Sequence, residues 1–364
     1  MIPFADLKRQ YHDLKEEIDF SINDSLNNTA FIGGKSVSTF EKSFSEYIGV
    51  NHCIACANGT DSLEILLKAM GIKEGDEVLV PAISWISTSE AVSSIGGVPI
   101  FIDIDPNNYT INTKLIRQKI TSKTKAIIPV HLYGQPADMR TIMSIAKDFN
   151  LKVLEDCAQA HGSKIDNQLV GTFGHSASFS FYPGKNLGAF GDAGCMVTND
   201  YSIAKTARMI ANHGQEGKHN HIIEGRNSRL DAIQATILNV KLPYLTKWIE
   251  TRNNIGNRYL LGITNPNIKI PIVNKSYFHS FHLFVIRSGN REELISYLKE
   301  NGIGTSIHYP TALPFLPCYN YMNHKHADFP IAHEYQDKIL SIPMFPELKD
   351  EEIQKVINVL NEFR

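Results

Sequence analysis

The sequence predicts an α/β fold: a large, mostly parallel sheet sandwiched by helices, followed by a smaller α+β unit. Three observations carry this prediction. Between about residues 52 and 200, apolar runs of strand length alternate with helical patterns, which is typical of a parallel sheet covered on both faces. With 364 residues and 43% apolar content, the chain can bury a large core. The composition then changes after Leu238, where longer helical patterns begin.

The chain opens with two expected helices. Apolar residues recur at three- and four-residue spacing, which predicts one helix containing Leu7, Tyr11, Leu14, Ile18 and Ile22. A second helix should turn inward the side chains of Val37, Phe40, Phe44 and Tyr47. The expected strands of the sheet follow at residues 52–57, 78–81, 98–102, 126–130, 153–155, 178–181 and 195–198.

The sequence pattern of the last third of the chain predicts a small α+β unit. It should hold a long helix from Lys241 to about Leu260, an apolar strand at 281–286, and helices at 291–301 and 350–363. We therefore expect a large cofactor-binding domain over residues 1–240 and a small domain over 241–364.

Charge and cysteine content narrow the function classes. The net charge is −2 and no basic stripe is present, which argues against a nucleic-acid partner. No leader pattern or membrane-length apolar run occurs, so we expect a cytoplasmic protein without a membrane partner. Cys53 and Cys56 have metal-ligand spacing but no second ligand pair, so free core cysteines and no metal site are expected.

A lysine and an acid occupy predicted strand ends. Lys185 stands in the segment Ser180 to Gly188, and Asp156 ends an apolar run upstream. Pyridoxal phosphate needs an amine to hold its aldehyde and a carboxylate to keep its ring nitrogen protonated. A lone lysine is usually a solvated surface charge, but the aromatic residues and glycines that flank Lys185 in the sequence are unusual around a surface lysine. An isolated Asp at such a position is often a helix N-cap.

Other strand ends carry groups that suit the same cofactor. The turn from Asn58 to Ser62 opens a helix whose free N–H groups suit a phosphate, although an N-cap by Thr60 or Asp61 explains it equally well. No P-loop or G-x-G-x-x-G pattern is present, so the phosphate is expected to belong to a cofactor. Trp85 could stack on a planar ring or pack in the core.

These motifs, in this order, resemble the DegT/StrS family of pyridoxal-phosphate sugar aminotransferases, within the fold type I superfamily. The resemblance covers nearly the whole chain. Its segments are Phe4-Ala5-Asp6-Leu7, Asn58-Gly59-Thr60-Asp61-Ser62-Leu63, Gly75-Asp76-Glu77-Val78, Glu155-Asp156-Cys157-Ala158-Gln159, Phe181-Tyr182-Pro183-Gly184-Lys185-Asn186-Leu187-Gly188, Asn227-Ser228-Arg229-Leu230-Asp231 and His308-Tyr309-Pro310.

The resemblance implies a role for each matching position. Lys185 would form the Schiff base with pyridoxal 5'-phosphate, which becomes pyridoxamine 5'-phosphate in the half-reaction, while Asp156 would hold the ring nitrogen. Further cofactor contacts would come from Gly59, Thr60, Trp85, Gln159 and Ser180. Asn227 would reach the cofactor phosphate of a neighbouring subunit, which implies a homodimer with shared active sites. Residues facing glutamate or the sugar nucleotide would be Arg229, His308 and Tyr309.

The implied activity is transfer of the amino group of L-glutamate to a keto nucleotide sugar, for deoxyamino-sugar or surface-polysaccharide (O-antigen) biosynthesis. A 3-keto hexose linked to dTDP or UDP is the expected substrate, and a 4-keto-6-deoxy sugar aminated at C-4 is the alternative. Family dehydratases carry histidine in place of the lysine, so Lys185 argues against that class. A non-enzymatic cofactor-binding sensor is a further alternative that the sequence leaves open.

Overall fold

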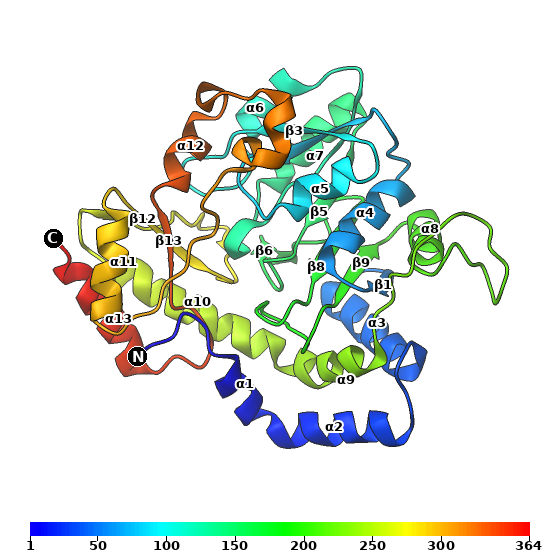
Figure 1. The fold of residues 1–364 in the computed structure, drawn as a ribbon, viewed down its shortest axis with the longest axis horizontal. Coiled ribbons are helices and arrows are strands. Elements are labelled where there is room, and N and C mark those ends of the chain that lie inside the picture. Colours follow the sequence, from blue (N-terminus) through cyan, green and yellow to red (C-terminus); the bar gives the residue numbers. More distant parts are fainter.

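The fold is built on one seven-stranded sheet, which the computed structural model describes together with the rest of residues 1–364 (Figure 1). The strand order is β1-β9-β8-β5-β4-β2-β3, and only β9 runs antiparallel to its neighbours. The predicted mostly parallel sheet is therefore confirmed. Its strands are β1 (His52–Cys56), β2 (Glu77–Pro81), β3 (Val98–Ile102), β4 (Thr124–Ile127), β5 (Lys152–Asp156), β8 (Ser176–Ser180) and β9 (Gly194–Thr198).

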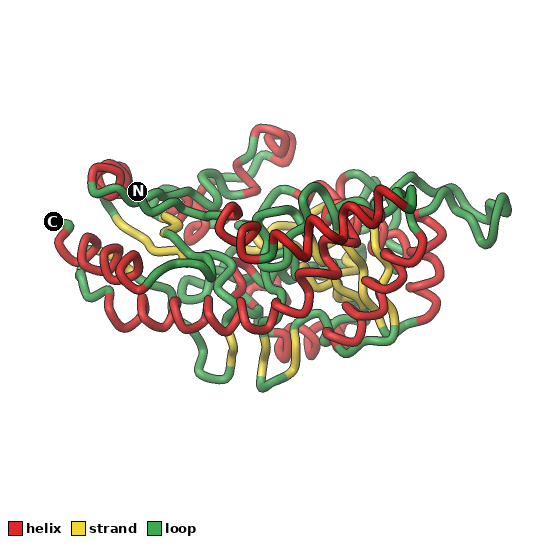
Figure 2. The backbone as a smooth tube through the Cα atoms, turned by 90° about the horizontal axis from the view of Figure 1, so that it is seen from below, coloured by secondary structure: helices red, strands yellow, loops and turns green.

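Helices cover both faces of the sheet, above and below the strands in Figure 2. This double cover explains why β2 reads as a continuous apolar run, because Val78, Leu79 and Val80 are all fully buried. One face carries α4 (Gly59–Ala69), α5 (Ser87–Ser93) and α8 (Tyr201–Ala211). The other carries α3 (Gly34–Ile48), α6 (Thr113–Lys119), α7 (Met139–Phe149) and α9 (Ala232–Lys241).

The amino-terminal segment forms two helices where the sequence predicts one. They are α1 (Leu7–Asp13) and α2 (Lys15–Asn27), and the break falls at Leu14. The Leu14 backbone leaves helical geometry and its N–H bonds to Tyr11, while its side chain packs with Ile18 against Trp248. Burial of Leu14 under α10 thus overrides the simple spacing pattern.

The carboxy-terminal part builds a second core around a small sheet of β10 (Ile268–Lys269), β12 (Phe284–Ser288) and β13 (Ile339–Ile342). Its helices are α10 (Leu245–Gly262), α11 (Arg291–Glu300) and α13 (Asp350–Glu362). The long helix begins at Leu245 and not at Lys241, because Lys241 ends α9 and a turn containing Pro243 intervenes. The expected domain boundary near residue 240 stays a prediction.

Smaller elements complete the fold. They are β6 (Lys164–Ile165), β7 (Gln168–Leu169), β11 (Tyr277–Phe278) and α12 (Pro330–Gln336). Part of the carboxy-terminal chain also packs back on the large core, where Leu313 donates its N–H to the carbonyl of Ala82, just after β2. This contact brings the small unit over the carboxyl ends of the parallel strands. No helix combines the length and the apolar character that crossing a lipid bilayer requires.

Truncating Phe44 tests the predicted inward face of α3. Its ring is fully buried, with ring centroids 5.1 Å from Phe179 and 5.2 Å from Phe181. Phe44→Ala should lower the free energy of unfolding by about 3–5 kcal/mol, because a large cavity is left behind. The matched control is Phe149→Ala on α7, whose ring is 41% exposed and whose loss should cost about 1 kcal/mol or less. Denaturant unfolding measures both, and equal losses would contradict this packing.

Candidate active site

A cavity of about 540 Å³ lies where the parallel strands end. It is lined by all the site residues that the sequence predicts except Asn227 and Arg229. The amino-terminal segment from Phe4 to Gln10 and the small unit also contribute side chains to its wall. This placement follows the general rule that open α/β sheets bind ligands beyond the carboxyl ends of their strands.

Lys185 enters the cavity from the turn after β8. Its N–H donates to the carbonyl of Tyr182 at 2.8 Å, and a Cβ on Gly188 would lie 2.3 Å from the carbonyl oxygen of Pro183. The turn therefore closes only with glycine at 188. Burial disfavours the charged amine and lowers the pKa of Lys185 to about 8, against the negative charge of Asp156, which raises it. An amine with this pKa is poised to act as a nucleophile and base near neutral pH.

Asp156 ends β5 and is buried at the same edge. One carboxylate oxygen accepts from Thr88 Oγ1 at 2.8 Å and the other from the Ala158 N–H at 3.1 Å. Burial raises the pKa of Asp156, while these two bonds and the charge of Lys185 lower it. No cationic side chain forms an ion pair with this carboxylate, so the site holds a buried acid that lacks a counter-ion.

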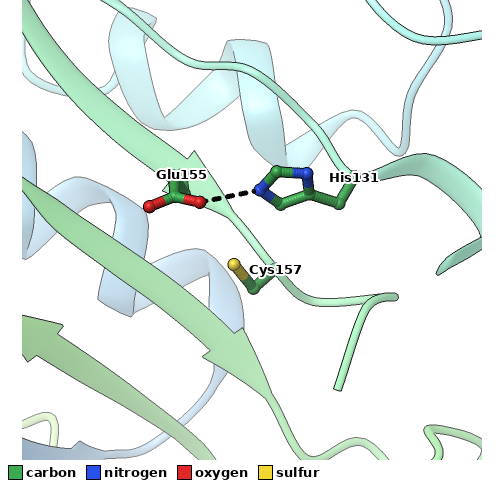
Figure 3. Close-up of side chains that lie close together, drawn as sticks. All are labelled: His131, Glu155 and Cys157. Atoms are coloured by element: carbon green, nitrogen blue, oxygen red, sulfur yellow. Dashed lines mark hydrogen bonds and ion pairs between the residues drawn. The ribbon is translucent and has the colours of Figure 1, made fainter. Parts of the chain in front are cut away.

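A hydrogen-bonded brace beside Asp156 fixes the end of β5 (Figure 3). Glu155 is fully buried and accepts from His131 Nε2 at 3.0 Å, as well as from the N–H groups of Gly171, Phe173 and Gly174. His131 Nδ1 accepts from the Ala137 N–H, so its Nε2 carries the hydrogen and donates the bond to Glu155. Cys157 lies close enough to complete a metal-ligand triad. Because the ligand atoms of His131 and Glu155 are already engaged, we assign the group a supporting role.

Gln159 is held in one orientation. Its Oε1 accepts from the Tyr133 N–H at 2.7 Å, so its Nε2 must be the group that faces the cavity, where it donates to Tyr309 Oη at 2.9 Å. Successive tight turns follow β5 here, because the Ala158 N–H is bonded to Asp156 and Gly162 adopts φ +76°. The side chains of Asp156 and Gln159 both face the cavity.

The start of α4 forms an anion-binding cradle. Asn58 is the N-cap, in place of Thr60 or Asp61, because its side chain accepts the Asp61 N–H at 2.8 Å. The N–H groups of Gly59 and Thr60 find no acceptor within the chain. A Cβ on Gly59 would lie 2.7 Å from Ser180 Cβ, so only glycine permits this approach. Free N–H groups at a helix start are a phosphate site.

Sequence reasoning missed two hydroxyl residues of α5. Ser87 Oγ lies 2.6 Å from Thr60 Oγ1, and Thr88 holds Asp156. Both follow the same strand end as Trp85, and that position is the signal that could have found them. Trp85 itself is 56% exposed, with its ring centroid 5.5 Å from that of Tyr309. The core-packing alternative for Trp85 is therefore wrong.

His308 lines the small-unit side of the cavity. Its Nδ1 lies 2.9 Å from Ser341 Oγ, and Phe4 stacks on its ring with centroids 5.5 Å apart. Burial and the charge of Lys185 lower the pKa of His308 to about 4. The imidazole is consequently neutral near pH 7 and can donate or accept a hydrogen bond from a substrate.

Asn227 and Arg229 lie outside the cavity of their own chain. Both are exposed, and both follow a segment after α8 that projects from the body in both views (Figures 1 and 2). The intervening Ser228 is buried and anchors the segment, since its Oγ accepts the Ala57 N–H at 3.3 Å. These two predicted site residues are therefore presented outward.

Comparison with known proteins shows the family of the chain. Residues 12–361 match the DegT/DnrJ/EryC1/StrS aminotransferase family. The chain belongs to this family. It is 40% identical over 100% of its length to a "pleiotropic regulatory protein" of Geobacillus stearothermophilus, covering 98% of that protein. It is 42% identical to the dTDP-3-amino-3,6-dideoxy-alpha-D-galactopyranose transaminase of Aneurinibacillus thermoaerophilus, with 100% and 99% coverage.

A solved structure of the family has the same fold. S. venezuelae DesV, crystallised in complex with a ketimine intermediate, superimposes with a TM-score of 0.97 at 37% identity, covering 99% of this chain and 98% of DesV. The predicted fold type I architecture and membership of the sugar aminotransferase family are thus confirmed.

The cofactor of such enzymes is pyridoxal 5'-phosphate, and the residues present fit it. The buried Asp156 lacks a counter-ion, which a protonated ring nitrogen would supply. The unpartnered N–H groups of Gly59 and Thr60 suit its phosphate, and the Lys185 amine suits its aldehyde. Asp156, the two N–H groups and the Lys185 amine therefore each have a counterpart on this cofactor.

The shifted pKa of Lys185 predicts a distinct reactivity in the cofactor-free protein. Its amine should react with a neutral acylating reagent with an apparent pKa of about 8. The control is Lys205 on α8, whose pKa is raised by its bond to Glu216, so it should react only at higher pH. Asp156→Asn removes a charge that raises the Lys185 pKa and should lower it further.

Peptide mass spectrometry across a pH series measures both lysines. Identical pH profiles for Lys185 and Lys205, or an upward shift in Asp156→Asn, would contradict this electrostatic picture.

Proposed function

We propose that this protein transfers the amino group of L-glutamate to a keto nucleotide sugar, with a 3-keto hexose linked to dTDP or UDP as acceptor. The observation that carries the proposal is the meeting of Lys185 and Asp156 in one cavity, beside the Gly59 and Thr60 N–H groups that have no acceptor within the chain. Similarity to a dTDP-3-amino-sugar transaminase supports amination at C-3.

Each cavity residue has a task in this chemistry. Pyridoxal phosphate, when bound, supplies an electron-accepting ring that makes a substrate Cα–H bond acidic. Lys185 Nζ, with its lowered pKa, would take the proton from the glutamate Cα in the first half-reaction and deliver a proton to the sugar carbon that receives the amine in the second. Asp156 holds a proton at the ring nitrogen, positioned by Thr88 and by the brace of Glu155 and His131. The donor Nε2 of Gln159 suits a ring oxygen.

The same proposal assigns the active site to a homodimer. Asn227 and Arg229 are exposed and lie outside the cavity of their own chain. A second copy related by two-fold symmetry would present them to the first copy's cavity, and the reverse. Asn227 would then reach the phosphate and Arg229 the substrate, with His308 and Tyr309 contributed by the chain that holds Lys185.

An acceptor panel tests the reaction. Purified enzyme with glutamate should aminate 3-keto nucleotide sugars, as measured by product mass and by 2-oxoglutarate release. Lys185→Ala should reduce turnover by about 10²–10⁴-fold, because the positioned proton carrier is lost. The control is Lys205→Ala, which alters an exposed lysine and should retain turnover. Preference for 4-keto-6-deoxy sugars would favour C-4 amination, and failure with glutamate would refute the proposed function.

Mixed dimers test the sharing of the active site. Lys185→Ala and Asn227→Ala should each be impaired alone. After the two are unfolded together and refolded as a mixture, activity should recover to about a quarter of wild type, because half of the dimers are mixed and each has one intact site. No recovery, in a mixture shown to contain mixed dimers, would mean that Asn227 acts within its own chain.

A further inference from the structure

A second cation lines the active-site cavity, besides Lys185, and has no role in the scheme above. Arg252 lies on α10 and is only 6% exposed. Its Nη1 donates to the backbone carbonyls of Phe281, His282 and Met344, at 3.2, 3.3 and 2.8 Å. These three bonds fix the guanidinium head in one orientation.

The remaining donor edge of Arg252 is unused. Its buried Nε has no hydrogen-bond partner, and Nη2 bonds to no group of the chain. Nε–H and the adjacent Nη2–H form the side of a guanidinium that binds a carboxylate through two parallel hydrogen bonds. The edge left free is therefore the one suited to bidentate recognition.

The charge of Arg252 is also unpaired. Burial lowers its pKa to about 10, and the only acid that acts against this is Glu347, which forms no ion pair with it. The other buried cation, Lys241, lies outside the cavity. It donates to the Gly188 carbonyl at 2.8 Å and sits 4.5 Å from the centroid of the Phe190 ring. An unpaired buried charge is unfavourable. Binding of an anion from outside the chain would therefore stabilise Arg252.

Arg252 and Lys185 line the same cavity. The charges of both residues act on His282, which lines the cavity and whose backbone carbonyl accepts from Arg252. Burial, together with the charges of Lys185 and Arg252, lowers the pKa of His282 well below its usual value. The imidazole is thus neutral, and it adds no charge that would compete for an anion.

We propose that Arg252 binds one carboxylate of the amino donor L-glutamate while the donor's amine is presented at Lys185. This assignment rests on the proposed function, and it names the residue that selects a dicarboxylic donor. A guanidinium could equally bind the diphosphate of the sugar nucleotide. Titrating with a dicarboxylate and, separately, with a nucleoside diphosphate distinguishes these two anions.

The test is calorimetric titration of the cofactor-loaded enzyme with glutarate, a dicarboxylate without an amine, and separately with UDP and dTDP. Arg252→Gln should weaken glutarate binding by about 10- to 100-fold, the worth of a charge-assisted pair, and leave nucleotide binding unchanged. The matched control is Arg258→Gln on the same helix, where the side chain pairs with Asp350 away from the cavity. This control should bind glutarate as wild type does.

Arg252→Lys provides a second variant, because the lost carbonyl bonds could impair folding of Arg252→Gln. Lysine keeps the charge but not the two-donor edge, so glutarate binding should still weaken, by about tenfold. The proposal would be overturned if either folded Arg252 variant bound glutarate with wild-type affinity. It would also be overturned if the variants lost affinity for UDP or dTDP and not for glutarate. If wild type fails to react with glutamate, the proposed function fails, whereas Arg252-dependent glutarate binding would stand independently.

Discussion

The structure depends on burying two opposite charges, Lys185 and Asp156, at the ends of the neighbouring strands β8 and β5. Neither group is paired in the usual way of a buried ion. Burial drives the pKa of Lys185 down and that of Asp156 up, while each charge partly restores the other. Such a pair is favourable when hydrogen bonds hold its members in place and a ligand with complementary groups completes it.

Much of the surrounding architecture serves to hold these two groups. The parallel strands align their carboxyl ends at one edge. Glu155 and His131 brace one side of β5 while Asp156 faces the other, as alternation along a strand requires. Gly188 permits the tight turn that carries Lys185, and the carboxy-terminal unit closes the cavity with His308 and Tyr309. The function follows from this enclosure, since family membership and the site chemistry both point to amino transfer.

The sequence predicted the sheet, its strands and most of the cavity because these features are local. Apolar runs mark buried parallel strands, and residues just after them must lie at one edge. The misses arose where distant packing decides. Leu14 breaks the first helix only because Trp248 lies against it, and Thr88 joins the site through a bond to Asp156, 68 residues further along the chain. Arg252 carries no motif signal at all, since its free edge is defined by three carbonyls from other segments.

Borohydride reduction of the cofactor-loaded enzyme tests whether Lys185 is the amine that holds the cofactor. The loaded enzyme is reduced, digested and mapped by peptide mass spectrometry. We expect a phosphopyridoxyl group on Lys185, in the peptide that contains it, and on no other lysine. Attachment at another lysine, or no attachment to an enzyme that still turns over, would contradict it.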